Sequence, residues 1–122
     1  MPRHLLVVDD EADIAAMVRL ALEDAGYRVA VAGDGRAALR LLGEARYDLV
    51  LSDVMMPYLD GAGLAAAMRA DPALRAIPLV LMSAAHAAAA RGVPHAAFLP
   101  KPFDLDQLIR TVARLVELGA EE

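Results

Sequence analysis

The chain has 122 residues, of which 58% are hydrophobic, and this is enough for one domain with a buried core rather than a disordered segment. It contains no cysteine, which excludes disulfides, thiolate nucleophiles and cysteine-based zinc sites. A formal net charge of −5 and only 4% aromatic residues argue against direct nucleic-acid binding. No apolar run is long enough to span a bilayer and none resembles a signal peptide, so we expect a cytoplasmic protein with no membrane contact.

Short apolar runs alternate with segments of helical periodicity along the whole chain. Strands are predicted at 5–8, 27–31, 49–52, 78–82 and 98–99. Helices are predicted at about 14–22, 37–42, 61–70 and 84–90, and from 105 onward after an Asp104 cap. Five strands that alternate with five helices predict an α/β fold, in which a parallel sheet is covered on both faces as a three-layer sandwich. No linker or internal repeat interrupts the pattern, so we expect one domain over 1–122.

Polar side chains stand where four of these strands end. Asp9 and Asp10 follow the first strand, Asp53 follows the third, Ser83 follows the fourth, and Lys101 follows the fifth. Parallel sheets bind ligands at the carboxyl ends of their strands. If the strand order is 2-1-3-4-5, the first and third strands are neighbours about 4.8 Å apart, and Asp10 and Asp53 are close enough to share a cation. A bound Mg²⁺ would keep such crowded carboxylates ionised.

Lys101 is the only lysine among the 12 basic residues, and it stands between two prolines. Its compact ammonium suits a small anionic group better than a planar guanidinium does, although drift would also explain a single lysine. In the order 2-1-3-4-5, Lys101 lies two strands away from Asp53, about 10 Å at the backbone, so its side chain must reach along the strand ends. An acidic metal-binding site with one nucleophile, one hydroxyl and one ammonium has the groups that phosphoryl transfer needs.

Four motifs together resemble those of one family, and they cover almost the whole chain in order. They are Val7-Val8-Asp9-Asp10-Glu11, Asp53-Val54-Met55-Met56-Pro57 with Asp60-Gly61, Met82-Ser83-Ala84, and Phe98 with Lys101-Pro102-Phe103. The sequence is similar to receiver domains of bacterial two-component response regulators, in particular to single-domain chemotaxis regulators. The resemblance implies a flavodoxin-like (βα)5 fold of strand order 2-1-3-4-5. It also implies a phosphoacceptor regulator in a phosphorelay, with no enzymatic activity beyond its own phosphorylation and slow autodephosphorylation.

The resemblance assigns roles to the acidic residues. Asp53 would accept a phosphoryl group from a sensor histidine kinase or phosphotransfer protein. Asp10, Asp53 and the backbone carbonyl of Met55 would bind Mg²⁺ directly, and Asp9 would bind it through a water. Mn²⁺ could take the place of Mg²⁺.

The same resemblance assigns roles near the last strand. Ser83 and Lys101 would each contact a phosphoryl oxygen, and the Lys101–Pro102 bond would be cis. Phe98 would turn inward when Ser83 moves, and this switch would alter binding of a downstream protein that the sequence does not identify.

Simpler interpretations exist for each residue. Asp9, Asp10 and Asp53 could cap helices, although capping does not explain two adjacent acids with a third on another strand. Ser83 alone is more often a cap than a ligand, and Phe98 would be a core residue in most proteins.

The segment around 84–91 departs from the family. The expected fourth helix is shortened by about one turn and is almost entirely alanine, so it buries little surface. This puts the family's usual dimer in doubt and leaves the oligomeric state open. We expect a stand-alone receiver that signals through another face or a specific partner.

Two other classes of function remain. An aspartate-nucleophile phosphohydrolase would carry its nucleophile after the first strand in an Asp-x-Asp pattern, whereas this strand ends in Asp-Asp-Glu. An inert interaction module on the same fold would typically lack one of the acid pair, the acceptor or the lysine, and this chain has all of them.

Overall fold

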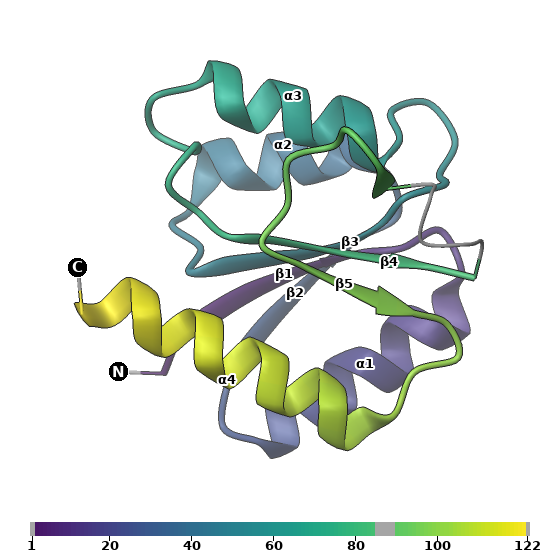
Figure 1. Ribbon diagram of the computed structural model, residues 1–122, viewed down its shortest axis with the longest axis vertical. Coiled ribbons are helices and arrows are strands. Elements are labelled where there is room, and N and C mark those ends of the chain that lie inside the picture. Colours follow the sequence, from purple (N-terminus) through teal and green to yellow (C-terminus); the bar gives the residue numbers. More distant parts are fainter. Residues whose placement is uncertain (1, 85–89, 122) are drawn as a thin grey trace.

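The structure is a computed structural model that describes residues 2–84 and 90–121, with side chains described as far as 117. Five strands form one parallel sheet in the order β2-β1-β3-β4-β5, as the resemblance implies (Figure 1). The strands are β1 (His4–Val8), β2 (Arg28–Ala32), β3 (Leu49–Asp53), β4 (Leu79–Ser83) and β5 (Ala97–Pro100). The helices within the described residues are α1 (Ala12–Asp24), α2 (Gly35–Glu44), α3 (Gly61–Ala70) and α4 (Leu105–Glu121).

The helices cover both faces of the sheet. Helices α2 and α3 lie on one face, and α1 and α4 lie on the other (Figure 1). Every residue of β3 and β4 is buried, because a central parallel strand is covered on both sides, and this is why both strands are nearly continuous apolar runs. Their side chains alternate between the two apolar clusters. The three-layer sandwich predicted from the sequence is confirmed.

Aspartates begin three of the helices. The carboxylate of Asp34 accepts a hydrogen bond from the Ala37 amide at 2.9 Å, and that of Asp60 accepts one from Gly63 at 2.8 Å. Asp104 does the same for the Asp106 amide at 2.9 Å, so the cap predicted for the last helix is confirmed.

Other boundaries differ from the sequence-based expectation by a residue or a few. Hydrogen bonding extends β3 and β4 to include Asp53 and Ser83 themselves. The short fourth helix expected around 84–91 falls mainly on 85–89, which lie outside the described residues. None of the described helices is long and apolar enough to cross a membrane.

Candidate functional site

Three aspartates meet at the carboxyl edge of the sheet. The register places Val8 of β1 opposite Ser52 of β3, so the residues that follow them are neighbours in space. One carboxylate oxygen from each of Asp9, Asp10 and Asp53 lies within 4.8 Å of the others. Asp9 and Asp53 are buried and Asp10 is exposed, so the cluster opens toward solvent on the side of Asp10.

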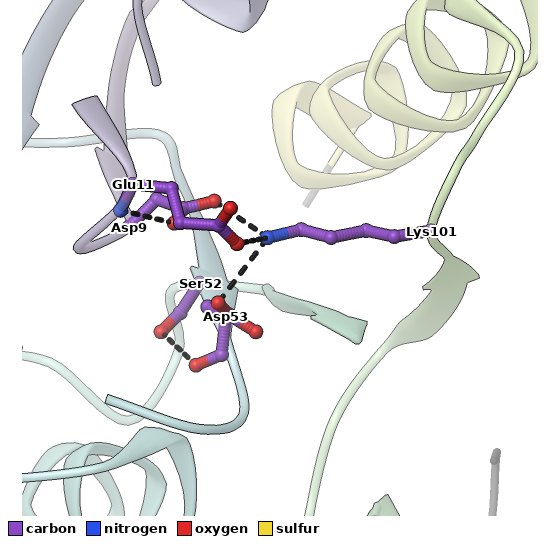
Figure 2. Close-up of polar contacts among 5 residues, drawn as sticks. All are labelled: Asp9, Glu11, Ser52, Asp53 and Lys101. Carbon is purple, nitrogen blue, oxygen red and sulfur yellow. Dashed lines mark hydrogen bonds and ion pairs between the residues drawn. The ribbon is translucent and has the colours of Figure 1, made fainter. Parts of the chain in front are cut away.

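Lys101 reaches this cluster from β5, as Figure 2 shows. Its Nζ atom lies 2.8 Å from a carboxylate oxygen of Asp9 and 3.2 Å from one of Asp53. It also lies 3.7 Å from Glu11, whose side chain is largely exposed. The ammonium therefore bridges the first and third strands, and its side chain spans the width that the strand order predicts.

The backbone at Lys101 continues the sheet and is followed by a proline. The Lys101 amide donates a hydrogen bond to the Ser83 carbonyl at 2.7 Å, which continues the pairing of β5 with β4. The following Lys101–Pro102 peptide bond is cis, as the resemblance implies.

The pKa values of Asp53 and Lys101 are both shifted, the first by burial and the second by neighbouring carboxylates. Burial raises the pKa of the Asp53 carboxyl above its ordinary value, and the neighbouring Lys101 ammonium opposes this only in part. Burial would lower the pKa of Lys101, but the hydrogen bond to Asp9 and the charges of Asp53 and Asp9 outweigh it, and the pKa is raised. Lys101 is therefore a permanent cation at neutral pH.

A cavity of about 270 Å³ lies in front of the cluster. It is lined by Asp10, Glu11, Asp53, Met55, Ser83, Ala84 and Lys101. Carboxylate, carbonyl and hydroxyl oxygens are the donors that a hard cation such as Mg²⁺ prefers, and the three clustered carboxylates outnumber the single ammonium. The residues present therefore fit a magnesium ion with room for a small anion beside it.

Of the predicted site residues, the structure brings together Asp9, Asp10, Asp53, Met55, Ser83 and Lys101. Phe98 does not line this cavity; it is half-buried and packs into the apolar cluster on the face covered by α2 and α3. Ser83 is buried at the cavity wall, at the end of β4.

Helix capping explains only one of the contacts of Asp9 and none of those of Asp53. The Asp9 carboxylate accepts a hydrogen bond from the Glu11 amide at 2.9 Å, one residue before α1 begins. Asp53 ends a strand rather than starting a helix, and its carboxylate is bonded to Lys101. Capping therefore does not explain the convergence of these acids.

Sequence reasoning missed two contributors. Glu11 joins the ion pairs of Lys101, and its place in the Asp-Asp-Glu triplet was the available signal. Gly61 packs so tightly behind β3 that an added Cβ would lie 2.7 Å from the Asp53 carbonyl oxygen. Its amide bonds to the Val54 carbonyl at 2.8 Å, and this closes the loop that follows β3.

Fold and site together define a phosphoacceptor domain of the receiver class. The family model for the response regulator receiver domain matches residues 5–113, and the chain belongs to this family, whose members act in two-component signalling.

Curated relatives are longer than this chain. The chain is 37% identical over 120 residues to the response regulator MprA of Mycolicibacterium vanbaalenii, an alignment that covers 95% of this chain and 51% of the relative. It is 40% identical over 84 residues to the DNA-binding response regulator MtrA of Mycobacterium tuberculosis, which covers 69% of this chain and 36% of that protein. The chain thus spans about half the length of the first of these relatives, and less of the second.

Solved structures agree with the fold. The chemotaxis response regulator CheY4 of Vibrio cholerae superposes with a TM-score of 0.87 at 33% identity, covering 94% of this chain and 99% of that one. The receiver domain of sensor histidine kinase PA1611 from Pseudomonas aeruginosa superposes with a TM-score of 0.90 at 28% identity, covering 96% of this chain and 99% of that one. That structure has a magnesium ion in its active site cleft. The flavodoxin-like fold is therefore that of known receivers.

Proposed function

We propose that Asp53 is the phosphoacceptor of this domain and that a histidine kinase or a phosphotransfer protein is the donor. The observation that carries the proposal is the position of the Asp53 carboxylate, which ends a buried strand, borders an open cavity and lies 3.2 Å from an ammonium. In the transfer, a carboxylate oxygen of Asp53 forms a bond to phosphorus as the phosphorus–nitrogen bond of the donor's phosphohistidine breaks. The family membership supports a cytoplasmic setting.

Lys101 and Ser83 would orient the transferred group. Lys101 already faces Asp53, so its ammonium is placed to pair with a phosphoryl oxygen without a large rearrangement. Ser83 borders the same cavity, and its hydroxyl is proposed to bond to another phosphoryl oxygen. Both groups would stabilise negative charge where it develops.

The acidic cluster would hold a divalent cation. Asp10, Asp53 and the Met55 carbonyl are the proposed direct ligands, and Asp9 is proposed to act through a water. Mg²⁺ would neutralise charge on the phosphoryl group, and Mn²⁺, which also takes oxygen ligands, would substitute for it. The clustered carboxylate oxygens support this assignment.

Phosphorylation would be read out by a conformational change. Movement of Ser83 toward the phosphoryl group would leave space that Phe98 could enter from its half-buried position, because the two residues lie on neighbouring strands and Phe98 pairs with Leu81, two positions before Ser83. A protein partner would recognise the altered surface of β4 and β5. The domain itself would be a regulator rather than a turnover enzyme, and it would lose its phosphoryl group slowly by hydrolysis.

Incubation with Mg²⁺ and acetyl phosphate, followed by intact mass spectrometry, tests this proposal. The wild type should gain one phosphoryl group, the Asp53→Asn variant should gain none, and Asp24→Asn, which alters an exposed aspartate at the end of α1, should behave as wild type. Multiple turnover on phosphomonoesters would instead show a phosphohydrolase. A wild type without adduct would show an inert interaction module.

A further inference from the structure

Tyr58 has a strained backbone in the loop between β3 and α3. Among the described residues it alone has a positive φ, 67°, without being glycine. The Leu59 amide bonds to the Pro57 carbonyl at 2.9 Å across it, which closes a three-residue γ-turn of the rare, strained kind. The Tyr58 side chain is 76% exposed, so burial of its ring does not compensate for this strain.

The first turn of α2 holds this loop at two adjacent points. The guanidinium carbon of Arg36 lies 4.3 Å from the centroid of the Tyr58 ring, which is the geometry of a cation–π contact. The Gly35 amide donates a hydrogen bond to the Leu59 carbonyl at 3.0 Å. The approach is close enough to require glycine, because a Cβ at position 35 would lie 2.4 Å from that carbonyl oxygen.

The other end of the loop is held beside the acceptor. The Gly61 amide bonds to the Val54 carbonyl at 2.8 Å, so the loop is tied at both ends. Between the two ties stands Met55, two residues after Asp53, and it lines the site cavity. The conformation at Tyr58 therefore constrains where the Met55 backbone lies.

We propose that Arg36 and Tyr58 are positioning residues, which hold the loop in the form that presents the Met55 backbone to the site. The proposal rests on the proposed function, since the Met55 carbonyl is assigned there as a ligand of Mg²⁺. The cation–π contact would offset the strain of the γ-turn, and without it the loop would sample other conformations. Order in the loop before binding lowers the entropy lost when the ion binds.

Two measurements on the purified chain test the pair. Calorimetric titration with Mg²⁺ gives the metal affinity, and hydrogen exchange of the Gly35 amide reports the tie between α2 and the loop. Arg36→Met keeps the length of the side chain but removes its charge. It should weaken Mg²⁺ binding about two- to fivefold, which corresponds to the interaction energy of an exposed cation–π contact. It should also speed exchange at Gly35 while helix content stays unchanged.

Matched variants isolate the contact. Arg36→Lys and Tyr58→Phe keep a cation and a ring, and both should retain most of the affinity. Arg40→Met removes another exposed arginine of α2 that has no ion pair or ring contact within the described residues, and it should match the wild type. Equal Mg²⁺ affinity and equal Gly35 exchange in Arg36→Met and Arg40→Met would overturn the pair's role.

Failure of the proposed function would look different. A wild type that binds no Mg²⁺ would remove the metal site, whatever the state of the loop. Hydrogen exchange of the Gly35 amide would still test the contact between α2 and the loop in that case, because this exchange does not depend on the ion. Faster exchange in Arg36→Met would support the loop tie alone, and unchanged exchange would overturn it as well.

Discussion

Lys101 and Asp9 form an ion pair of 2.8 Å across 92 positions of sequence, and their side chains are 7% and 0% exposed. The same ammonium is the nearest cation to Asp53 and Glu11. One positive charge therefore serves three carboxylates, with Asp10 beside them as a fourth. This surplus of negative charge in a partly buried site makes the cluster both unstable by itself and receptive to a divalent cation.

Removal of the ammonium should destabilise the fold. Lys101→Met would leave the buried Asp9 carboxylate without its cation, and we expect the free energy of unfolding in EDTA to fall by about 3 kcal/mol. Urea denaturation followed by circular dichroism measures this. Arg110→Met alters an exposed residue of α4 and should change stability by no more than about 0.5 kcal/mol. Equal stability of Lys101→Met and wild type would contradict the buried pair.

Removal of the Asp53 charge should instead stabilise the fold. Burial raises the pKa of Asp53, so the folded state binds a proton more readily than the unfolded state does. Ionisation of Asp53 therefore lowers stability as the pH rises through its ordinary pKa and then its raised folded-state pKa. Asp53→Asn should be more stable than wild type at pH 7 in EDTA, and this advantage should shrink toward pH 4. Denaturation curves of both proteins at pH 7 and pH 4 measure this difference in stability. A variant less stable than wild type at pH 7 would contradict a raised pKa of Asp53.

Asp10 should matter for the ion but not for the fold. It is exposed and forms no ion pair within the described part of the chain, so Asp10→Asn should keep the wild-type melting temperature in EDTA. Mg²⁺ at a hundred times its dissociation constant should stabilise the wild type by about 2.7 kcal/mol, and Asp10→Asn by much less at the same concentration. Differential scanning calorimetry with and without Mg²⁺ measures both. An undiminished magnesium effect in the variant would remove Asp10 from the ligand set.

Two glycines should respond to alanine in opposite directions. At Gly61 the new Cβ would meet backbone atoms of Asp53 and Val54 at 2.7 and 2.9 Å, so Gly61→Ala should cost about 1–3 kcal/mol of stability. At Gly43 an added Cβ meets nothing within 4 Å on the exposed side of α2, so Gly43→Ala should add about 0.5–1 kcal/mol. Thermal denaturation compares them. A neutral Gly61→Ala would mean that the backbone at the end of β3 yields to the added methyl group.

The fold was largely predictable because its signals are local or periodic. Apolar runs identified the five strands of the sheet, and Asp104 marked a helix start that the structure confirms. Strand ends were less predictable, since Asp53 and Ser83 join their strands through hydrogen bonds to neighbouring strands that no local pattern encodes.

The membership of the candidate site could also be predicted, but its internal pairing could not. Polar residues at strand ends indicated Asp9, Asp10, Asp53, Ser83 and Lys101, because a parallel sheet brings these ends to one edge. That Lys101 lies nearest to Asp9, and that Glu11 joins it, depends on side-chain rotamers and on the solvent excluded around them. The tie between Arg36 and Tyr58 gave no sequence signal, because a tyrosine at positive φ contradicts its own backbone preference.

The sequence by itself determined a five-stranded α/β domain and the polar residues that gather at one edge of its sheet. Hydrophobic periodicity, composition and the residues that begin and end each element carry that information. Only the tertiary structure decided which of those charges are buried together and how the loop after β3 is held. These outcomes are set by distances between segments far apart in the chain, and such distances exist only once the two apolar clusters have packed on either side of the sheet.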